Sequence, residues 1–152
     1  MKPLPFPFPL NIGTDVVHLP RVARLLTRQK GYLERFSRRI LCEQEQNDFR
    51  TRFKLTSSAF DTLNTSPHMV SAEMTRWLAG RFAAKEAARK AAPTGAAYTG
   101  WKEILVRVEE QDPSAGSSRP EIVYLDDKGG RVGKLSISHD GEYVVATVLA
   151  AS

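Results

Sequence analysis

Cysteine and histidine are scarce in this chain of 152 residues, which contains one cysteine, Cys42, and three histidines. A single thiol cannot form a disulfide within the chain, and no cluster of cysteine and histidine has the spacing of a zinc site. We expect Cys42 to be a small core residue. The lack of a disulfide framework favours a reducing compartment over secretion.

Long apolar runs are also lacking. No stretch approaches the roughly 20 apolar residues that span a bilayer, so we expect no membrane partner. The first nine residues, MKPLPFPFP, alternate proline with apolar residues and cannot form an amphipathic targeting helix. If the protein works inside an organelle, its presequence is expected to be atypical or absent from this chain.

The charge balance is basic, with a net charge of +5 and a pI near 9.6. Such a balance predicts an acidic partner, such as nucleic acid, an anionic membrane, a polyphosphate cofactor or an acidic protein. The excess is modest and spread along the chain, which disfavours nucleic acid. Hydrophobic content of 41% and charged content of 26% are typical of a globular protein of one domain.

The order of the predicted elements indicates one α+β domain over residues 10–152, after a proline-rich tail at 1–9. Lys54–Val70 has no clear period and is interpreted as a flexible insertion. Helices are predicted at Arg21–Gln29, Glu34–Leu41, Glu43–Phe53 and Trp77–Ala92. Strands are predicted at Leu10–Val17, Trp101–Glu110, Pro120–Leu125, Lys134–Ser138 and Tyr143–Ala150. Hairpin connections favour a mainly antiparallel sheet packed on a long central helix, with turns at Gln111–Arg119 and at His139-Asp140-Gly141.

The central helix, Trp77–Ala92, carries one carboxylate, Glu86, among several cations. Glu86 shares a stripe with Phe82 and Lys90, at steps of four residues. A neighbouring stripe is basic and consists of Arg81, Lys85 and Arg89. A third stripe has only small side chains, those of Ala79, Ala83, Ala87 and Ala91. This arrangement suits a phosphate-rich ligand bridged by a divalent metal. The alternative is a surface helix stabilised by Glu–Lys pairs.

Asp15 is the only charge in the apolar strand Leu10–Val17. A carboxylate conflicts with strand propensity, and such conflicts tend to mark functional sites. The alternative is that Asp15 caps the helix that follows.

The chain resembles the holo-acyl-carrier-protein synthase family, the small AcpS-type 4′-phosphopantetheinyl transferases. The resemblance covers nearly the whole domain except Lys54–Val70, and its most specific part is Leu78–Ala87 with Lys90-Ala91. The other matching segments are Ile12–Val17, Arg35-Phe36, Arg39–Leu41, Trp101–Ile104, Arg119-Pro120, Leu135–Asp140 and Tyr143–Ala146. The resemblance implies Mg²⁺-dependent transfer of phosphopantetheine from coenzyme A to a serine of an apo acyl carrier protein, with release of 3′,5′-ADP.

By the same resemblance, Asp15 and Glu86 are the Mg²⁺ ligands, and Lys90 is the active-site lysine that contacts the diphosphate. The coenzyme A contacts that the resemblance implies are Arg81, Lys85, Lys90, Thr94, Gly95, Ser138 and His139. Without the resemblance, a lone histidine at a hairpin such as His139 is more often structural.

The family docks its acidic carrier protein on the first helix, which implies this role for Arg21, Arg24 and Arg28. The alternative is a solvated cationic face. The family also implies a homotrimer with active sites between protomers, and His139 is a candidate contribution across the interface. Helices in the first half of the chain leave one sheet face without cover, which independently favours a symmetric assembly.

The sequence departs from the bacterial pattern at His18, where a glutamate is common, and at Pro93-Thr94-Gly95, where Gly-Thr-Gly is common. The long path through residues 54–70 and the proline-rich start suggest a eukaryotic, fungal relative that serves a carrier protein in the mitochondrial matrix; the alternative is the cytoplasm. A basic binding module without catalysis is the alternative function, but it leaves Asp15 unexplained.

Overall fold

The computed structural model describes residues 1–108 and 119–152, and it confirms an α+β fold with an antiparallel sheet. The helices are α1 (Leu19–Arg28), α2 (Tyr32–Ile40), α3 (Glu43–Arg52), α4 (Ser57–Thr65) and α5 (Ala72–Ala91), with short 3-10 turns η1 (Pro67–Met69) and η2 (Trp101–Glu103). The strands are β1 (Leu10–His18), β2 (Ile104–Val108), β3 (Pro120–Tyr124), β4 (Arg131–Asp140) and β5 (Tyr143–Ala151). Neighbouring strands pair in the order β1-β5-β4-β3-β2. Residues 1–9 precede the first strand without forming a helix or strand.

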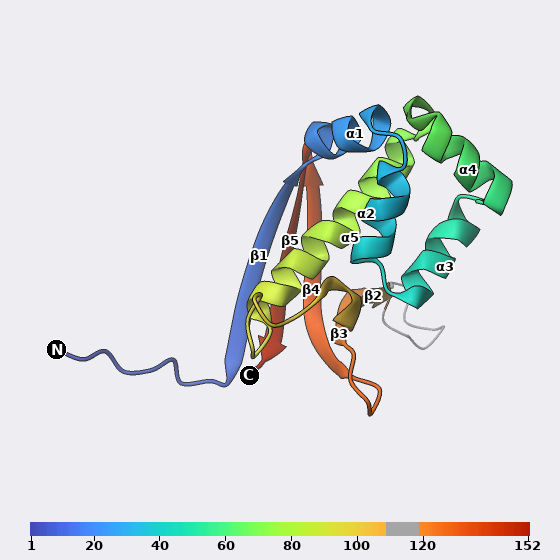
Figure 1. Cartoon of the computed structure of the whole chain (residues 1–152). Coiled ribbons are helices and arrows are strands. Elements are labelled where there is room, and N and C mark those ends of the chain that lie inside the picture. The colour runs from blue at the N-terminus through green and yellow to red at the C-terminus, as the bar shows by residue number, and fades with distance from the viewer. Residues whose placement is uncertain (109–118) are drawn as a thin grey trace.

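The central helix α5 is five residues longer at its start than the sequence predicts, because Ser71 caps it. The Ser71 hydroxyl accepts a hydrogen bond from the Met74 amide at 3.1 Å. The helix ends at Ala91, just before Pro93, as expected. It lies along β1 and β5, and the other helices are gathered on the same side of the sheet (Figure 1).

Close contact between α5 and the sheet depends on the alanine stripe and on Gly13. Ala79, Ala83, Ala87 and Ala91 are all fully buried. A Cβ added to Gly13 would overlap the carbonyl oxygen of Ala87 and approach the amide nitrogen of Ala91 to 2.9 Å. Only glycine therefore fits at this crossing, and the crossing fixes where α5 residues lie relative to β1.

The prediction of a flexible insertion over Lys54–Val70 is wrong, because the segment contains α4 and η1. The Thr56 hydroxyl caps α4 by accepting from the Ala59 amide at 3.1 Å. Phe60, Leu63 and Val70 are buried in the main core. Two large apolar side chains in nine residues of helix are too few to show a period, although they anchor the helix in the core.

The other elements differ modestly from the predicted ranges. The strand expected at Trp101–Glu110 begins three residues later, at Ile104, because Trp101–Glu103 forms η2. Positions 109–118, which include the end of that strand and most of the expected turn at 111–119, lie outside the described residues. Strand β4 continues through His139 and Asp140, so the turn to β5 is Gly141-Glu142, with Gly141 at φ +53°.

The face of the sheet opposite α5 carries exposed apolar side chains. They lie on β1 and β5 and are Leu10, Ile12, Val16, Tyr143, Val145 and Leu149. Alternation along each strand places these residues on one face, while Gly13, Val17, Val144 and Ala146 meet the helix. The sheet therefore has one covered and one uncovered face. No helix in the described part of the chain is both long and apolar enough to cross a membrane.

Candidate active site

Asp15 and Glu86, which the sequence places 71 positions apart, line one cavity of about 370 Å³. Its wall is built from β1, α1, α2, α5 and η2. Aromatic and aliphatic side chains form much of the lining: Val22, Leu25, Tyr32, Phe36, Phe82 and Trp101. The cavity thus combines two carboxylates with a largely apolar wall, as small-molecule sites do.

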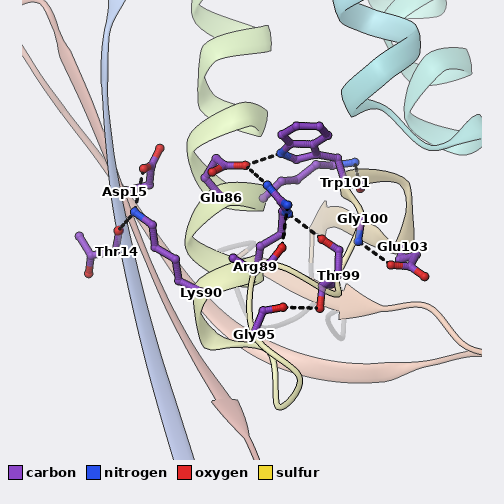
Figure 2. Close-up of polar contacts among 12 residues, drawn as sticks. Thr14, Asp15, Glu86, Arg89, Lys90, Gly95, Thr99, Gly100, Trp101 and Glu103 are labelled. Atoms are coloured by element: carbon purple, nitrogen blue, oxygen red, sulfur yellow. Dashed lines mark hydrogen bonds and ion pairs between the residues drawn. The ribbon is translucent and has the colours of Figure 1, made fainter.

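Asp15 lies within β1, opposite Ala146 of β5, and not at the start of α1. His18 is the residue that precedes α1, so the alternative of Asp15 as a helix cap does not hold. The Lys90 ammonium donates to Asp15 Oδ1 at 3.0 Å and to the carbonyl oxygen of Thr14 at 2.8 Å (Figure 2). Lys90, the expected contact of the diphosphate, therefore lies beside Asp15, and its side chain is 47% exposed.

Glu86 is held through one carboxylate oxygen. Its Oε1 accepts a hydrogen bond from Arg89 Nη1 at 2.7 Å and another from the Trp101 indole Nε1 (Figure 2). Arg89 is itself fixed, because its Nε donates to the carbonyl oxygen of Thr99 at 2.6 Å and its Nη2 to that of Ala96 at 2.7 Å. The carboxylate therefore has a defined orientation at the cavity wall.

The donor set fits a hard divalent cation. Within the part of the chain that the structure describes, Asp15 Oδ2 and Glu86 Oε2 accept no hydrogen bond. Two carboxylates are what Mg²⁺ commonly takes from a protein, with substrate oxygens and water as its other ligands. Over residues 1–108 and 119–152, no group of three or more histidine, cysteine or acidic residues is placed to hold a metal.

The prediction that Lys85 contacts coenzyme A is wrong, because Lys85 is fully buried in the protein interior. Its ammonium pairs with the equally buried Glu45 and donates to the carbonyl oxygens of Ile40, at 2.6 Å, and Trp101, at 3.0 Å. Glu45 also accepts from the backbone amides of Cys42 and Val106, each at 3.0 Å. Burial lowers the pKa of Lys85, and the Glu45 carboxylate opposes that effect.

Arg81 and His139 lie together, but in a second cavity of about 510 Å³ that shares no residue with the first. The Arg81 guanidinium lies over the Trp77 ring, 3.8 Å from its centroid. Its buried Nε has no hydrogen-bond partner among the described residues, and burial lowers the pKa of Arg81. Arg81 and Glu86 are five residues apart on α5, about 140° around the helix, so they face different directions.

The remaining coenzyme candidates line neither cavity in the described structure. Thr94 and Gly95 lie in the turn after α5, where the Thr94 hydroxyl is 3.1 Å from that of Thr99 and Gly95 has φ +78°. Ser138 lies on β4 opposite Val145, on the uncovered sheet face. Their role in coenzyme binding stays a prediction.

The three arginines of the first helix are exposed, as a docking surface requires. Arg21, Arg24 and Arg28 follow one another along α1, and Val22 and Leu26 on the opposite side are buried. Arg21 also lines the cavity that holds Asp15 and Glu86. The basic surface of α1 therefore reaches the edge of the candidate site.

Sequence reasoning missed the residues that hold the site from behind. Trp101 was part of a matching segment without a role, and Glu45 was an unremarked residue of α3. The position of Glu45, three residues after Cys42 at the start of α3, is a capping-box signal that predicts its bond to the Cys42 amide. Nothing in the local sequence indicates its pairing with Lys85, 40 positions away.

Sequence comparisons relate the chain to known enzymes. The chain is 63% identical over 157 aligned positions to the mitochondrial 4′-phosphopantetheinyl transferase B of Aspergillus fumigatus, with 99% of each chain covered. It is 35% identical to a holo-(acyl-carrier-protein) synthase of Gloeobacter violaceus, with 91% of this chain and 89% of that one covered.

Among solved structures, the fold is similar to a holo-(acyl-carrier-protein) synthase of Bacillus anthracis in complex with CoA (3′,5′-ADP). The TM-score is 0.60 and the identity 29%, with 93% of this chain and 96% of that chain covered. A profile of the 4′-phosphopantetheinyl transferase superfamily matches residues 11–148. The chain belongs to the 4′-phosphopantetheinyl transferase superfamily and is a transferase of that family.

Proposed function

We propose that this protein transfers 4′-phosphopantetheine from coenzyme A to a serine of an acidic acyl carrier protein, in a Mg²⁺-dependent reaction that releases 3′,5′-ADP. The observation that carries the proposal is the meeting of Asp15 and Glu86 at one cavity, with the Lys90 ammonium bonded to Asp15. One oxygen of each carboxylate is free of hydrogen bonds among the described residues. Similarity to a structure in complex with CoA (3′,5′-ADP) supports the donor, and similarity to holo-(acyl-carrier-protein) synthases supports the acceptor.

Asp15 and Glu86 would hold the Mg²⁺ through Oδ2 and Oε2. When bound, the ion supplies neutralisation of the charge that develops as the bond to the departing 3′,5′-ADP breaks. Lys90 has its ammonium beside Asp15 and nearly half of its side chain exposed. It is therefore available to contact the diphosphate of coenzyme A while it remains within reach of Asp15.

The coenzyme site is proposed to be shared between two copies of a homotrimer. Lys90 lies beside Asp15 of the first cavity, whereas Arg81 and His139 line the second, so one protomer does not gather all the predicted coenzyme contacts. The exposed apolar face of the sheet supports association, since Ile12 is 69% exposed and Val16 60% exposed. A closed trimer would bring the second cavity of one copy to the first cavity of its neighbour.

Docking of the acidic carrier protein is assigned to α1. Exposed Arg21, Arg24 and Arg28 supply positive charge, and Arg21 lines the cavity that contains Asp15. A carrier protein on α1 would have its serine close to the coenzyme. The arginine charges would raise the association rate of the carrier protein and orient it, and they would affect the rate of the chemical step less.

The mitochondrial matrix is the proposed compartment. The Aspergillus fumigatus relative is named as mitochondrial and aligns with 99% of this chain. Fatty acid biosynthesis on a mitochondrial carrier protein is the process that this activity would serve.

The test is metal-dependent transfer by paired variants. Asp15→Ala and Glu86→Ala are expected to remain folded and to lose transfer of phosphopantetheine to an apo carrier protein in Mg²⁺. Thermal melting checks that both variants are folded, because each carboxylate also accepts hydrogen bonds in the metal-free protein. A folded Glu86→Ala variant with near-normal turnover in Mg²⁺ contradicts the assignment.

A further inference from the structure

The Glu86 carboxylate is oriented by a neighbour from outside its helix, Trp101 of η2. The indole Nε1 donates to Oε1, and Arg89 Nη1 donates to the same oxygen. Both donors use Oε1, so the free oxygen, Oε2, has only a restricted range of positions. A glutamate without such contacts rotates among many rotamers, whereas a metal ligand must lie close to one geometry.

The Trp101 ring cannot easily turn away from this bond. Two guanidinium groups lie over the ring, with the Cζ of Arg89 4.4 Å and the Cζ of Arg39 4.8 Å from its centroid. The Phe82 ring lies at its side, with the two centroids 6.4 Å apart. The indole is therefore restrained on several sides, from α2 and from α5.

The backbone of Trp101 is anchored as firmly as its ring. Its carbonyl oxygen accepts from the Lys85 ammonium at 3.0 Å, inside the buried pair of Lys85 and Glu45. The same pair is joined to α2 through the Ile40 carbonyl and to β2 through the Val106 amide. A continuous set of contacts thus leads from the interior ion pair, through Trp101, to the Glu86 carboxylate.

We infer that Trp101 is a positioning residue, whose indole N–H holds Glu86 in the orientation that presents Oε2 to the divalent cation. The inference rests on the proposed function. It gives the buried Lys85 and Glu45 a function as well, since they fix the backbone from which the indole projects. The inference also predicts different metal affinities for tryptophan and phenylalanine at position 101, because the indole has an N–H that reaches Glu86 and the phenyl ring has no donor.

Trp101→Phe tests the inference, because it keeps an aromatic ring beside Arg39 and Arg89 and removes the N–H. Mn²⁺ is the probe, titrated into wild type and variant with saturating coenzyme A, and free Mn²⁺ is counted by electron paramagnetic resonance. We expect the variant to bind Mn²⁺ about tenfold more weakly, the effect typical of losing the hydrogen-bond partner of a metal ligand. The Mg²⁺ concentration for half-maximal transfer should rise equally, while KM for coenzyme A at saturating Mg²⁺ changes little.

Trp77→Phe is the matched control, since Trp77 lies in the second cavity against Arg81. The affinity of this variant for coenzyme A is expected to change, because Arg81 is a proposed coenzyme contact, but at saturating coenzyme A it should bind Mn²⁺ as the wild type does. It leaves Trp101 as the only tryptophan. Mg²⁺ should then change the Trp101 emission in Trp77→Phe and fail to do so in Trp77→Phe combined with Glu86→Gln. If Trp101→Phe does not fold, this measurement of Trp101 emission tests the positioning role instead.

The outcomes separate the two claims. If the wild type binds no Mn²⁺ and transfers nothing in Mg²⁺, the proposed function fails. If the wild type binds Mn²⁺ and is active, but Trp101→Phe binds Mn²⁺ equally well, only the positioning role of Trp101 fails. Unchanged Trp101 emission at saturating Mg²⁺, with transfer intact, overturns the positioning role in the same way.

Discussion

Replacing Lys85 by methionine is expected to destabilise the protein rather than to weaken coenzyme A binding. Methionine nearly matches lysine in length but cannot donate, so Glu45 would remain as an unpaired charge in a fully buried position. Removing one partner of a buried ion pair typically costs about 3–5 kcal/mol. The free energy of unfolding of a domain is only about 5–15 kcal/mol, so the loss is a large share of the total.

Urea unfolding measures this loss, with Lys102→Met as the control because Lys102 is an exposed lysine of η2. The control should stay within about 0.5 kcal/mol of the wild type. Combining Lys85→Met with Glu45→Gln should cost less than the sum of the two single changes, by about 0.5–3 kcal/mol, because the two side chains interact directly.

Kinetics on the folded fraction of Lys85→Met complete the test. KM for coenzyme A should change little, because the Lys85 ammonium contacts Glu45 and two carbonyl oxygens in the interior. A Lys85→Met variant as stable as Lys102→Met, with a strongly raised KM for coenzyme A, would refute the buried pair and restore the role expected from the sequence.

Three further outcomes are expected. Gly13→Ala should lower the free energy of unfolding by about 1–3 kcal/mol in a denaturant titration, because the new Cβ overlaps the Ala87 carbonyl oxygen; unchanged stability would mean that α5 and β1 are not in close contact. Arg24→Glu should raise KM for the carrier protein but not for coenzyme A; equal effects on both would assign α1 to the coenzyme site. Burial raises the pKa of Tyr124 to about 12. The raised pKa makes a contribution to stability that is fully present below pH 10. The free energy of unfolding should therefore fall by about 2–3 kcal/mol as pH rises from 10 through 12. Tyr124→Phe should remove this part of the pH dependence in unfolding titrations, and an identical dependence in both proteins would contradict it.

Much of the fold could be predicted because local sequence and global structure agree. Strong helix formers before Pro93 indicated α5, and its alanine stripe indicated a helix in close contact with a sheet. Asp15 was recognisable because a carboxylate conflicts with the apolar strand around it. Glu86 was recognisable because it is the one carboxylate among the cations of Trp77–Ala92. The motifs of the family then related the two, and the structure brings them to one cavity.

The failures have physical causes. Helix α4 has two buried apolar residues, Phe60 and Leu63, and a surface of serine, threonine and asparagine. The amino-acid composition of this helix is therefore like that of a loop. Lys85 follows Arg81 by one turn and was assigned to the same basic stripe. The tertiary structure buries Lys85 against Glu45, a partner that no local pattern indicates. Long-range pairing of this kind is set by packing and not by periodicity.

The oligomeric state is tested by sedimentation across a dilution series, with transfer measured at the same concentrations. Specific activity should fall as the trimer dissociates, because Arg81 and His139 line a different cavity from Asp15 and Glu86 in one protomer. A fully active monomer would contradict the shared site.

The most direct measurement is the intact mass of an apo acyl carrier protein after incubation with this protein, coenzyme A and Mg²⁺. The proposed function predicts that the carrier protein gains the mass of one phosphopantetheine group, that 3′,5′-ADP appears in equal amount, and that chelation of Mg²⁺ prevents both. An unchanged carrier mass with folded enzyme, or an equal gain after Mg²⁺ is removed, would contradict it.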